Sequence, residues 1–85
     1  MQEHEYKLKY SKKATKYYLK TSGKARRRID KMLEDLRTLD GDIEYIQQYG
    51  YYRIKIEHYR AIFTVNQAEN IIDIHAIGTK NDMRY

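Results

Sequence analysis

Three segments rich in β-branched and aromatic residues follow one another from residue 51 onward, with only short polar turns between them. They run roughly from Tyr51 to Glu57, from Tyr59 to Asn66 and from Ile71 to Ile77. Segments of this length and composition favour strands, and strands joined by short turns pair as antiparallel neighbours. The sequence therefore predicts three consecutive antiparallel strands in the second half of the chain.

The first half of the chain favours helices. From Lys24 to about Leu39, apolar residues recur at steps of three and four, the spacing of a helix that packs one face on a core. A shorter amphipathic helix is predicted from Lys12 to about Thr21, with Ser11 as its N-cap.

Two further segments complete the pattern. Apolar and charged residues alternate in HEYKLKYS, residues 4–11, which predicts a half-buried strand. The stretch DGDIEYIQQYG, residues 40–50, has turn residues and no clear period, so we interpret it as a connection with room for one short strand. The chain is then an α+β protein with two N-terminal helices packed on a small, largely antiparallel sheet of about four strands.

Composition limits the classes of function. The 85 residues contain no proline and no obvious linker, and we expect one domain over residues 1–85. The absence of cysteine excludes a disulfide framework, a thiolate metal site and a cysteine nucleophile. No segment has the apolar pattern of a signal peptide or a membrane span, so we expect a soluble, cytoplasmic protein. The net charge of +5 favours RNA or an acidic protein as partner, although a solvated basic surface explains it equally well.

The segment YYRIKIEHYRAIFTV, residues 51–65, is predicted to form a hairpin with basic side chains on one face. If Glu57 and His58 form a two-residue turn, Lys55 pairs with Arg60, and cross-strand partners share a face of the sheet. Like charges in that position cost up to about 1 kcal/mol unless an anion or an acidic side chain lies between them. We therefore hypothesise that this open face, which also carries Arg53 and Ile62, binds phosphate.

Two alternatives remain open for the hairpin. Long basic side chains also extend into water from a solvated sheet face at little cost. In addition, Glu57 and His58 are neither glycine nor asparagine, which two-residue turns prefer, and a longer turn would shift the pairing by one residue.

Other candidate residues are weighed against simpler interpretations. Arg26, Arg27, Arg28 and Lys31 fall mostly off the apolar stripe of the longer helix, and a solvated face explains them better than direct contact with RNA. The histidines are scattered without ligand spacing, so we expect no metal site and no cofactor; they are His4, His58 and His75. Most tyrosines fall on apolar stripes and are predicted to be core residues; among them are Tyr6, Tyr10, Tyr17 and Tyr18.

The second half of the chain resembles the RelE/ParE superfamily of bacterial and archaeal toxins from type II toxin–antitoxin systems. That superfamily has a Y-[KR]-I-[KR] motif followed by Y-R, a closing strand that ends in I-G and a basic residue, and a tyrosine near the C-terminus. The matching positions here are Tyr52, Arg53, Ile54, Lys55, Tyr59, Arg60, Ile77, Gly78, Lys80 and Tyr85.

The resemblance implies a curved sheet with two helices and, in the RelE branch, a ribosome-dependent endoribonuclease that cuts mRNA. It implies catalytic roles for Lys55, Arg60, Lys80 and Tyr85, with Arg53 binding RNA, and an antitoxin, the ribosome and mRNA as partners. Relative to one ribonuclease pattern, Arg53 replaces a lysine and Lys80 replaces an arginine, exchanges that are not neutral where a fork binds phosphate.

Two other functions remain open at this point. The ParE branch shares the fold but acts on DNA gyrase without a known nuclease site. A non-catalytic module that binds RNA or protein is the third interpretation, and it predicts salt-sensitive RNA binding without a cleavage product.

Overall fold

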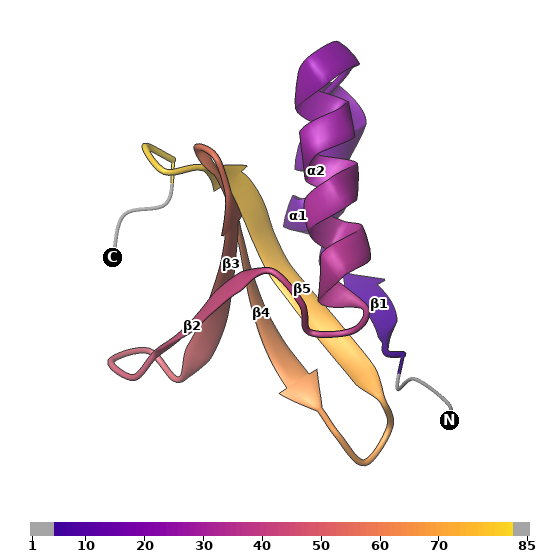
Figure 1. The fold of residues 1–85 in the computed structure, drawn as a ribbon, viewed down its shortest axis with the longest axis vertical. Coiled ribbons are helices and arrows are strands. Elements are labelled where there is room, and N and C mark those ends of the chain that lie inside the picture. Colours follow the sequence, from indigo (N-terminus) through magenta and orange to yellow (C-terminus); the bar gives the residue numbers. More distant parts are fainter. Residues whose placement is uncertain (1–4, 83–85) are drawn as a thin grey trace.

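Five strands form one sheet and two helices cover one of its faces in the computed structural model, which describes residues 5–82 (Figure 1). The elements are β1 (Lys7–Tyr10), α1 (Lys12–Lys20), α2 (Gly23–Leu36), β2 (Asp42–Ile46), β3 (Tyr51–Ile56), β4 (Tyr59–Asn66) and β5 (Ile71–Thr79). Neither helix within residues 5–82 is long and apolar enough to cross a membrane.

The strand order across the sheet is β1-β5-β4-β3-β2. The three antiparallel strands predicted from residue 51 onward, β3, β4 and β5, are confirmed in consecutive pairing. The α+β class is confirmed as well, but the sheet has five strands and is mixed, because β1 pairs with β5 in parallel and β2 adds to β3. Residues 42–46, interpreted as part of a connection, thus form an edge strand.

A tight turn between α2 and β2 brings that edge strand onto the sheet. Gly41 has a φ of +100°, a backbone conformation that side chains other than glycine rarely adopt. A Cβ at Gly41 would also lie 3.3 Å from Cδ1 of Ile54, so the position is crowded as well as conformationally demanding. Glycine therefore allows the chain to turn closely against the core at this point.

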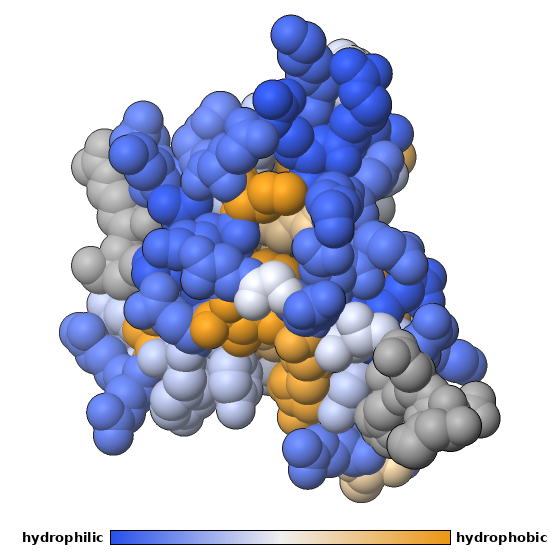
Figure 2. All heavy atoms as spheres, in the orientation of Figure 1, coloured by the Kyte–Doolittle hydropathy of each residue, from blue (hydrophilic) through white to orange (hydrophobic). Residues whose placement is uncertain are grey.

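The core lies between the helices and the sheet. The stripe predicted for α2 is confirmed, because Ile29, Met32, Leu33 and Leu36 are all buried. They face buried strand residues of which the largest are Phe63, Ile54, Ile72 and Ile74. Figure 2 shows apolar atoms between α2 and the strands, whereas the surface of α2 on this face of the molecule is mostly hydrophilic.

The predicted tyrosine positions are confirmed in part. Tyr6 is buried, and Tyr17 and Tyr18 are partly buried against the core. Tyr10 is 42% exposed, so its assignment to the core was wrong. It is the last residue of β1, a four-residue strand at the edge of the sheet.

A β-bulge in β5 adjusts which side chains reach the core. Ile62 pairs with Ala76 and Phe63 with Ile74, so His75 is an extra residue without a partner across the ladder. Because sides alternate along a strand, the extra residue lets Ile74 and Ile77 face the same side although three positions separate them. Both are buried, and the open face receives Ala76 and Gly78 instead.

Ser11 joins α1 to β5. Its hydroxyl accepts a hydrogen bond from the Ala14 amide at 3.0 Å, which confirms the predicted N-cap, and donates one to the His75 carbonyl at 2.8 Å. One side chain thus satisfies a helix end and anchors the helix to the bulge.

We predict that Ser11→Ala lowers the free energy of unfolding by about 1–2 kcal/mol, because it removes the cap and the anchor together. The matched control is Ser22→Ala, since Ser22 is the N-cap of α2 but makes no side-chain capping bond, and it should change the stability by less than about 0.5 kcal/mol. Urea denaturation of the three proteins measures both values. Equal losses for the two variants would contradict the assigned role of Ser11.

Candidate functional site

The β3–β4 hairpin has the predicted register. Glu57 and His58 are the two turn residues, Ile56 pairs with Tyr59, and Lys55 pairs with Arg60. Ile54, between the basic positions of β3, is 1% exposed and faces the helices. The basic side chains of β3 and β4 therefore share the open face of the sheet, away from α1 and α2.

The turn forms without glycine because other groups hold it. Glu57 takes the positive φ of +55°, which a residue with a Cβ rarely adopts. Its carboxylate forms an ion pair with Arg28 of α2, with Oε1 2.6 Å from Nε. Its carbonyl accepts a hydrogen bond from Nη1 of Arg60 at 2.9 Å. These contacts stabilise the two-residue turn although its sequence lacks the glycine or asparagine that such turns prefer.

Acidic residues of β2 lie beside the cations of β3. Asp42 is the cross-strand partner of Lys55, and Glu44 is that of Arg53. Nη2 of Arg53 is 2.5 Å from Oε1 of Glu44, and Nζ of Lys55 is 3.8 Å from Oδ2 of Asp42. These carboxylates of the same chain offset the positive charges of β3. The closeness of basic residues in the hairpin is therefore not evidence by itself that Arg53 and Lys55 bind phosphate.

Sequence reasoning missed both carboxylates because it treated residues 40–50 as a connection. The signal was present in the alternation of Asp42 and Glu44 around Ile43, which is the period of a strand with an acidic face. The pKa of Glu44 is lowered, first by the hydrogen bond from Arg53 and by the charge of that guanidinium. The carboxylate is therefore held in its charged form beside the basic strand.

Arg60 differs from the cations of β3. Nη1 donates to the carbonyls of Glu57 and Tyr59, at 2.9 and 3.1 Å, and within residues 5–82 its side chain makes no ion pair. Its partner on β5 is Gly78, which places no side chain beside the guanidinium. The remaining donors of the fork are therefore available for a planar, two-point contact with a phosphate.

Lys80 lies at the same end of the sheet. Its backbone N–H donates to the carbonyl of His58 at 2.9 Å, so it follows β5 directly beside the hairpin turn. Reciprocal bonds close its loop, from the Thr79 amide to Oδ2 of Asp82 at 3.1 Å and from the Asp82 amide to Oγ1 of Thr79 at 3.3 Å. Tyr85, the fourth predicted catalytic residue, lies outside the described residues.

The basic residues of α2 do not share the open face. Arg26 is used at the α1–α2 connection, where Nη2 donates to the carbonyls of Tyr18 and Thr21 at 3.0 and 2.8 Å. Its guanidinium also lies over the Tyr18 ring, 4.2 Å from the centroid. Arg27 and Lys31 instead line a cavity of about 400 Å³ that reaches the hairpin turn; the other lining residues are Lys24, Arg28, Ile56 and Glu57.

His75 is an exposed residue on the bulge rather than the partly buried strand residue that its position favours. Its Nε2 lies 2.9 Å from Oγ1 of Thr64, which connects the bulge to β4. Within residues 5–82 no group of three or more histidine, aspartate or glutamate side chains is arranged to hold a metal ion.

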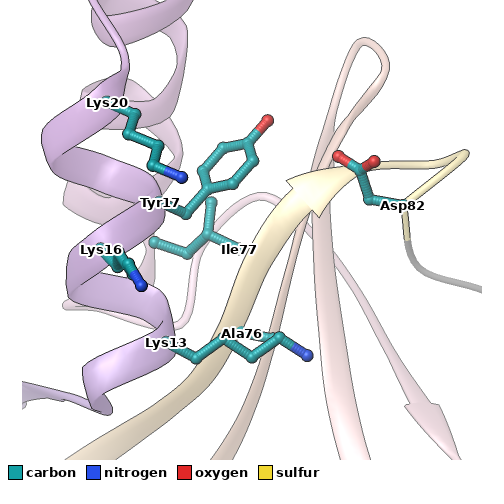
Figure 3. A pocket seen from close by; sticks show the side chains of 7 residues that line it. All are labelled: Lys13, Lys16, Tyr17, Lys20, Ala76, Ile77 and Asp82. Carbon is teal, nitrogen blue, oxygen red and sulfur yellow. The ribbon is translucent and has the colours of Figure 1, made fainter.

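A second basic surface lies between α1 and β5, apart from the hairpin cations. A cavity of about 310 Å³ opens there, as Figure 3 shows, with lysines of α1 on one side and Asp82 on the other. It is lined by Lys13, Lys16, Tyr17, Lys20, Ala76, Ile77 and Asp82. Burial is the main cause that raises the pKa of Tyr17, and the charge of Asp82 adds to it. The groove therefore combines an apolar floor with a basic rim.

The chain has the α+β fold of chains in solved RelE–RelB toxin–antitoxin structures, and the predicted resemblance to the RelE/ParE superfamily is confirmed at the level of the fold. No family model matches the sequence, and no curated protein matches it significantly. The likeness therefore rests on solved structures.

Three of these structures illustrate the agreement. A chain of the toxin–antitoxin complex RelBE2 from Mycobacterium tuberculosis matches with a TM-score of 0.73 at 13% identity, over 92% of this chain and 94% of that one. A chain of the RelB–RelE antitoxin–toxin complex from Methanococcus jannaschii gives 0.68 at 25% identity, over 87% and 92%. The isolated E. coli RelE toxin gives 0.65 at 20% identity, over 87% and 83%.

We predict that Glu44 contributes stability that is lost in acid. Because its pKa is lowered in the folded protein, the contribution is complete above the pKa of an unfolded glutamate, about 4.3, and is lost as the pH falls through the lower folded pKa. Glu44→Gln should therefore have a lower Tm than the parent at pH 7, and the difference should disappear in acid.

Thermal unfolding between pH 2 and pH 7 measures this difference. The control is Glu69→Gln, since Glu69 is an exposed residue of the β4–β5 turn and its side chain makes no ion pair within the described part of the chain. A Tm difference for Glu44→Gln that stayed constant over the whole range would show that the Arg53 pair has no linked protonation.

Proposed function

We propose that this protein is the toxin of a type II toxin–antitoxin system and acts as a ribosome-dependent endoribonuclease on mRNA. The observation that carries the proposal is the arrangement around one turn, where Lys55 and Arg60 are direct partners and Lys80 is bonded to the carbonyl of His58. The likeness to the isolated E. coli RelE toxin supports the toxin role.

The proposed reaction uses the RNA's own 2′-hydroxyl. Its oxygen attacks the adjacent phosphorus as a base takes the proton, the bond from phosphorus to the 5′-oxygen breaks, and that oxygen receives a proton. The products are a 2′,3′-cyclic phosphate and a free 5′-hydroxyl. The protein must accept one proton, stabilise the extra charge on the phosphorane and supply one proton.

Each of these tasks has a candidate side chain. The open donors of Arg60 suit the equatorial oxygens of the phosphorane, because its fork is held from behind by the turn carbonyls. Lys55 is the proposed base or electrostatic support, and at 3.8 Å its contact with Asp42 is loose enough to be exchanged for substrate. We assign stabilisation or protonation of the leaving oxygen to Lys80, stacking or proton transfer to Tyr85, and RNA binding to Arg53.

The ribosome supplies what these side chains lack. No histidine acts as acid or base in the scheme, and lysine and arginine are weak proton-transfer groups near neutral pH. Positioning of the 2′-oxygen in line with the leaving group compensates for weak chemistry, because fixed geometry alone contributes several orders of magnitude in rate. We therefore propose that free mRNA is cut slowly or not at all.

The proposed protein partner is an antitoxin. The complexes from M. tuberculosis and M. jannaschii each pair a toxin with an antitoxin. By analogy, a segment with acidic and apolar side chains would cover the open face of this sheet and neutralise Arg60 and Lys55. Such a segment gains much of its order on binding. Toxin, antitoxin and ribosome would meet in the cytoplasm.

We predict that the purified protein cleaves mRNA only in the presence of ribosomes, which mapping of 5′ ends in a translation reaction measures. Arg60→Ala should reduce the rate by about 100- to 1,000-fold, since a preorganised donor to the developing charge is lost. Lys55→Ala should reduce it by at least about 100-fold, and Tyr85→Phe by a smaller factor. Lys12→Ala, on the exposed first turn of α1, is the control and should retain the parent rate.

Other outcomes would replace the proposal. Intact mRNA together with DNA damage in cells that express the parent protein would indicate a gyrase-directed toxin. RNA binding that weakens with salt but gives no product in any translation mixture would indicate a binding module.

The α2 cations are predicted to bind RNA without a role in chemistry. Arg27→Ala and Lys31→Ala should each raise KM and reduce its salt dependence, with kcat within about twofold of the parent, because phosphate contacts act uniformly on ground and transition states. Arg26→Ala should instead lower the Tm, since its guanidinium joins α1 to α2. A drop in kcat for Arg27→Ala would argue against the assignment.

A further inference from the structure

One ion pair connects the helical layer to the hairpin turn of the candidate site. Nε of Arg28, in the second turn of α2, is 2.6 Å from Oε1 of Glu57. Arg28 belongs to the basic residues of α2 that fall outside its apolar stripe. Arg28 lines the same cavity as Arg27 and Lys31, but its carboxylate partner is on the hairpin turn, whereas Lys31 pairs with Asp35 of its own helix.

The same turn holds two of the proposed catalytic residues. The carbonyl of Glu57 accepts from Nη1 of Arg60 at 2.9 Å, and the carbonyl of Tyr59 accepts from the same atom at 3.1 Å. The carbonyl of His58 accepts from the amide of Lys80 at 2.9 Å. Three successive carbonyls therefore set where the Arg60 guanidinium and the Lys80 backbone lie.

The orientation of those carbonyls depends on a demanding backbone conformation. Glu57 has a φ of +55° in a two-residue turn that contains no glycine. A residue with a Cβ keeps a positive φ only where several surrounding contacts hold it there. Without such contacts, we expect a short turn to relax to another backbone geometry. Arg28 contacts the Glu57 side chain from outside the hairpin.

We propose that Arg28 is a positioning residue: through Glu57 it fixes the hairpin turn, and the turn in turn fixes Arg60 and Lys80 for phosphate stabilisation. The catalytic part of this inference rests on the proposed function, whereas the mechanical part does not. The pair is partly exposed, with side chains 37% and 51% accessible, so its loss should leave the protein folded.

The competing explanation is that Arg28 simply adds one positive charge for RNA. Arg37 provides a matched control, because it also lies at α2, is 43% exposed and pairs with a carboxylate, that of Glu34 at 3.6 Å, but far along the helix from the turn. Arg37→Ala removes the same charge and a longer, local ion pair without touching the hairpin.

Hydrogen exchange of the Lys80 amide tests the mechanical part by NMR, without any assay of activity. Arg28→Ala should speed that exchange by at least about tenfold, while amides in the centre of β4 keep their protection. Arg37→Ala should leave the Lys80 amide unchanged. The reversed pair, Arg28→Glu with Glu57→Arg, should restore protection to within about threefold of the parent.

Single-turnover cleavage on ribosomes tests the catalytic part. Arg28→Ala should lower the cleavage rate at saturation by about tenfold, while the concentration that gives half of this rate stays within twofold of the parent. The reversed pair should recover most of the rate. An unchanged exchange rate of the Lys80 amide in Arg28→Ala would overturn the proposal. It would also be overturned if Arg28→Ala changed only the concentration at half-saturation, and by the same factor as Arg37→Ala. If the parent itself cleaves nothing, the proposed function fails, and the exchange result still decides whether Arg28 positions the turn.

Discussion

The register of the β3–β4 hairpin is the constraint on which the candidate site depends. Pairing Lys55 with Arg60 puts both on the open face and puts Ile54 and Ala61 in the core, and a shift of one residue would exchange the two sets. Two acidic residues of β2 and the contacts to Glu57 make that register tolerable despite like charges and a turn without glycine. Burial on one face and ion pairing on the other thus select the same arrangement.

Much of this structure could be predicted from local patterns. The stripe of α2, the Ser11 cap and the pairing of the last three strands follow from periods of 3.6 and 2 and from short turns. The parallel pairing of β1 with β5 could not be predicted, because these strands are far apart in the sequence. The alternation of apolar and polar residues indicates a strand but does not indicate which strand it pairs with. The bulge at His75 is similar, since its signal is only the odd spacing between Ile74 and Ile77.

The basic residues of the candidate site could be predicted from the sequence, but the residues that pair with them could not. Arg53, Lys55 and Arg60 follow from the hairpin pattern, and the resemblance to toxins added Lys80. The partners Asp42, Glu44 and Arg28 come from β2 and α2, so they become visible only when the strands and helices are assembled. They change the interpretation, because Arg53 is closely paired and Lys55 loosely paired with carboxylates of β2, whereas Arg60 keeps donors open and is the cation best placed for a phosphate.

The central claim is that RNA is cut through its own 2′-hydroxyl beside Arg60 and Lys55. The most direct measurement replaces that hydroxyl with hydrogen at the cleaved nucleotide of an mRNA bound in a programmed ribosome, and compares cleavage at this and neighbouring positions. The account predicts that the substituted position stays intact while an unmodified transcript is cut there to leave a 2′,3′-cyclic phosphate. Cleavage of the substituted position at the original rate would contradict it.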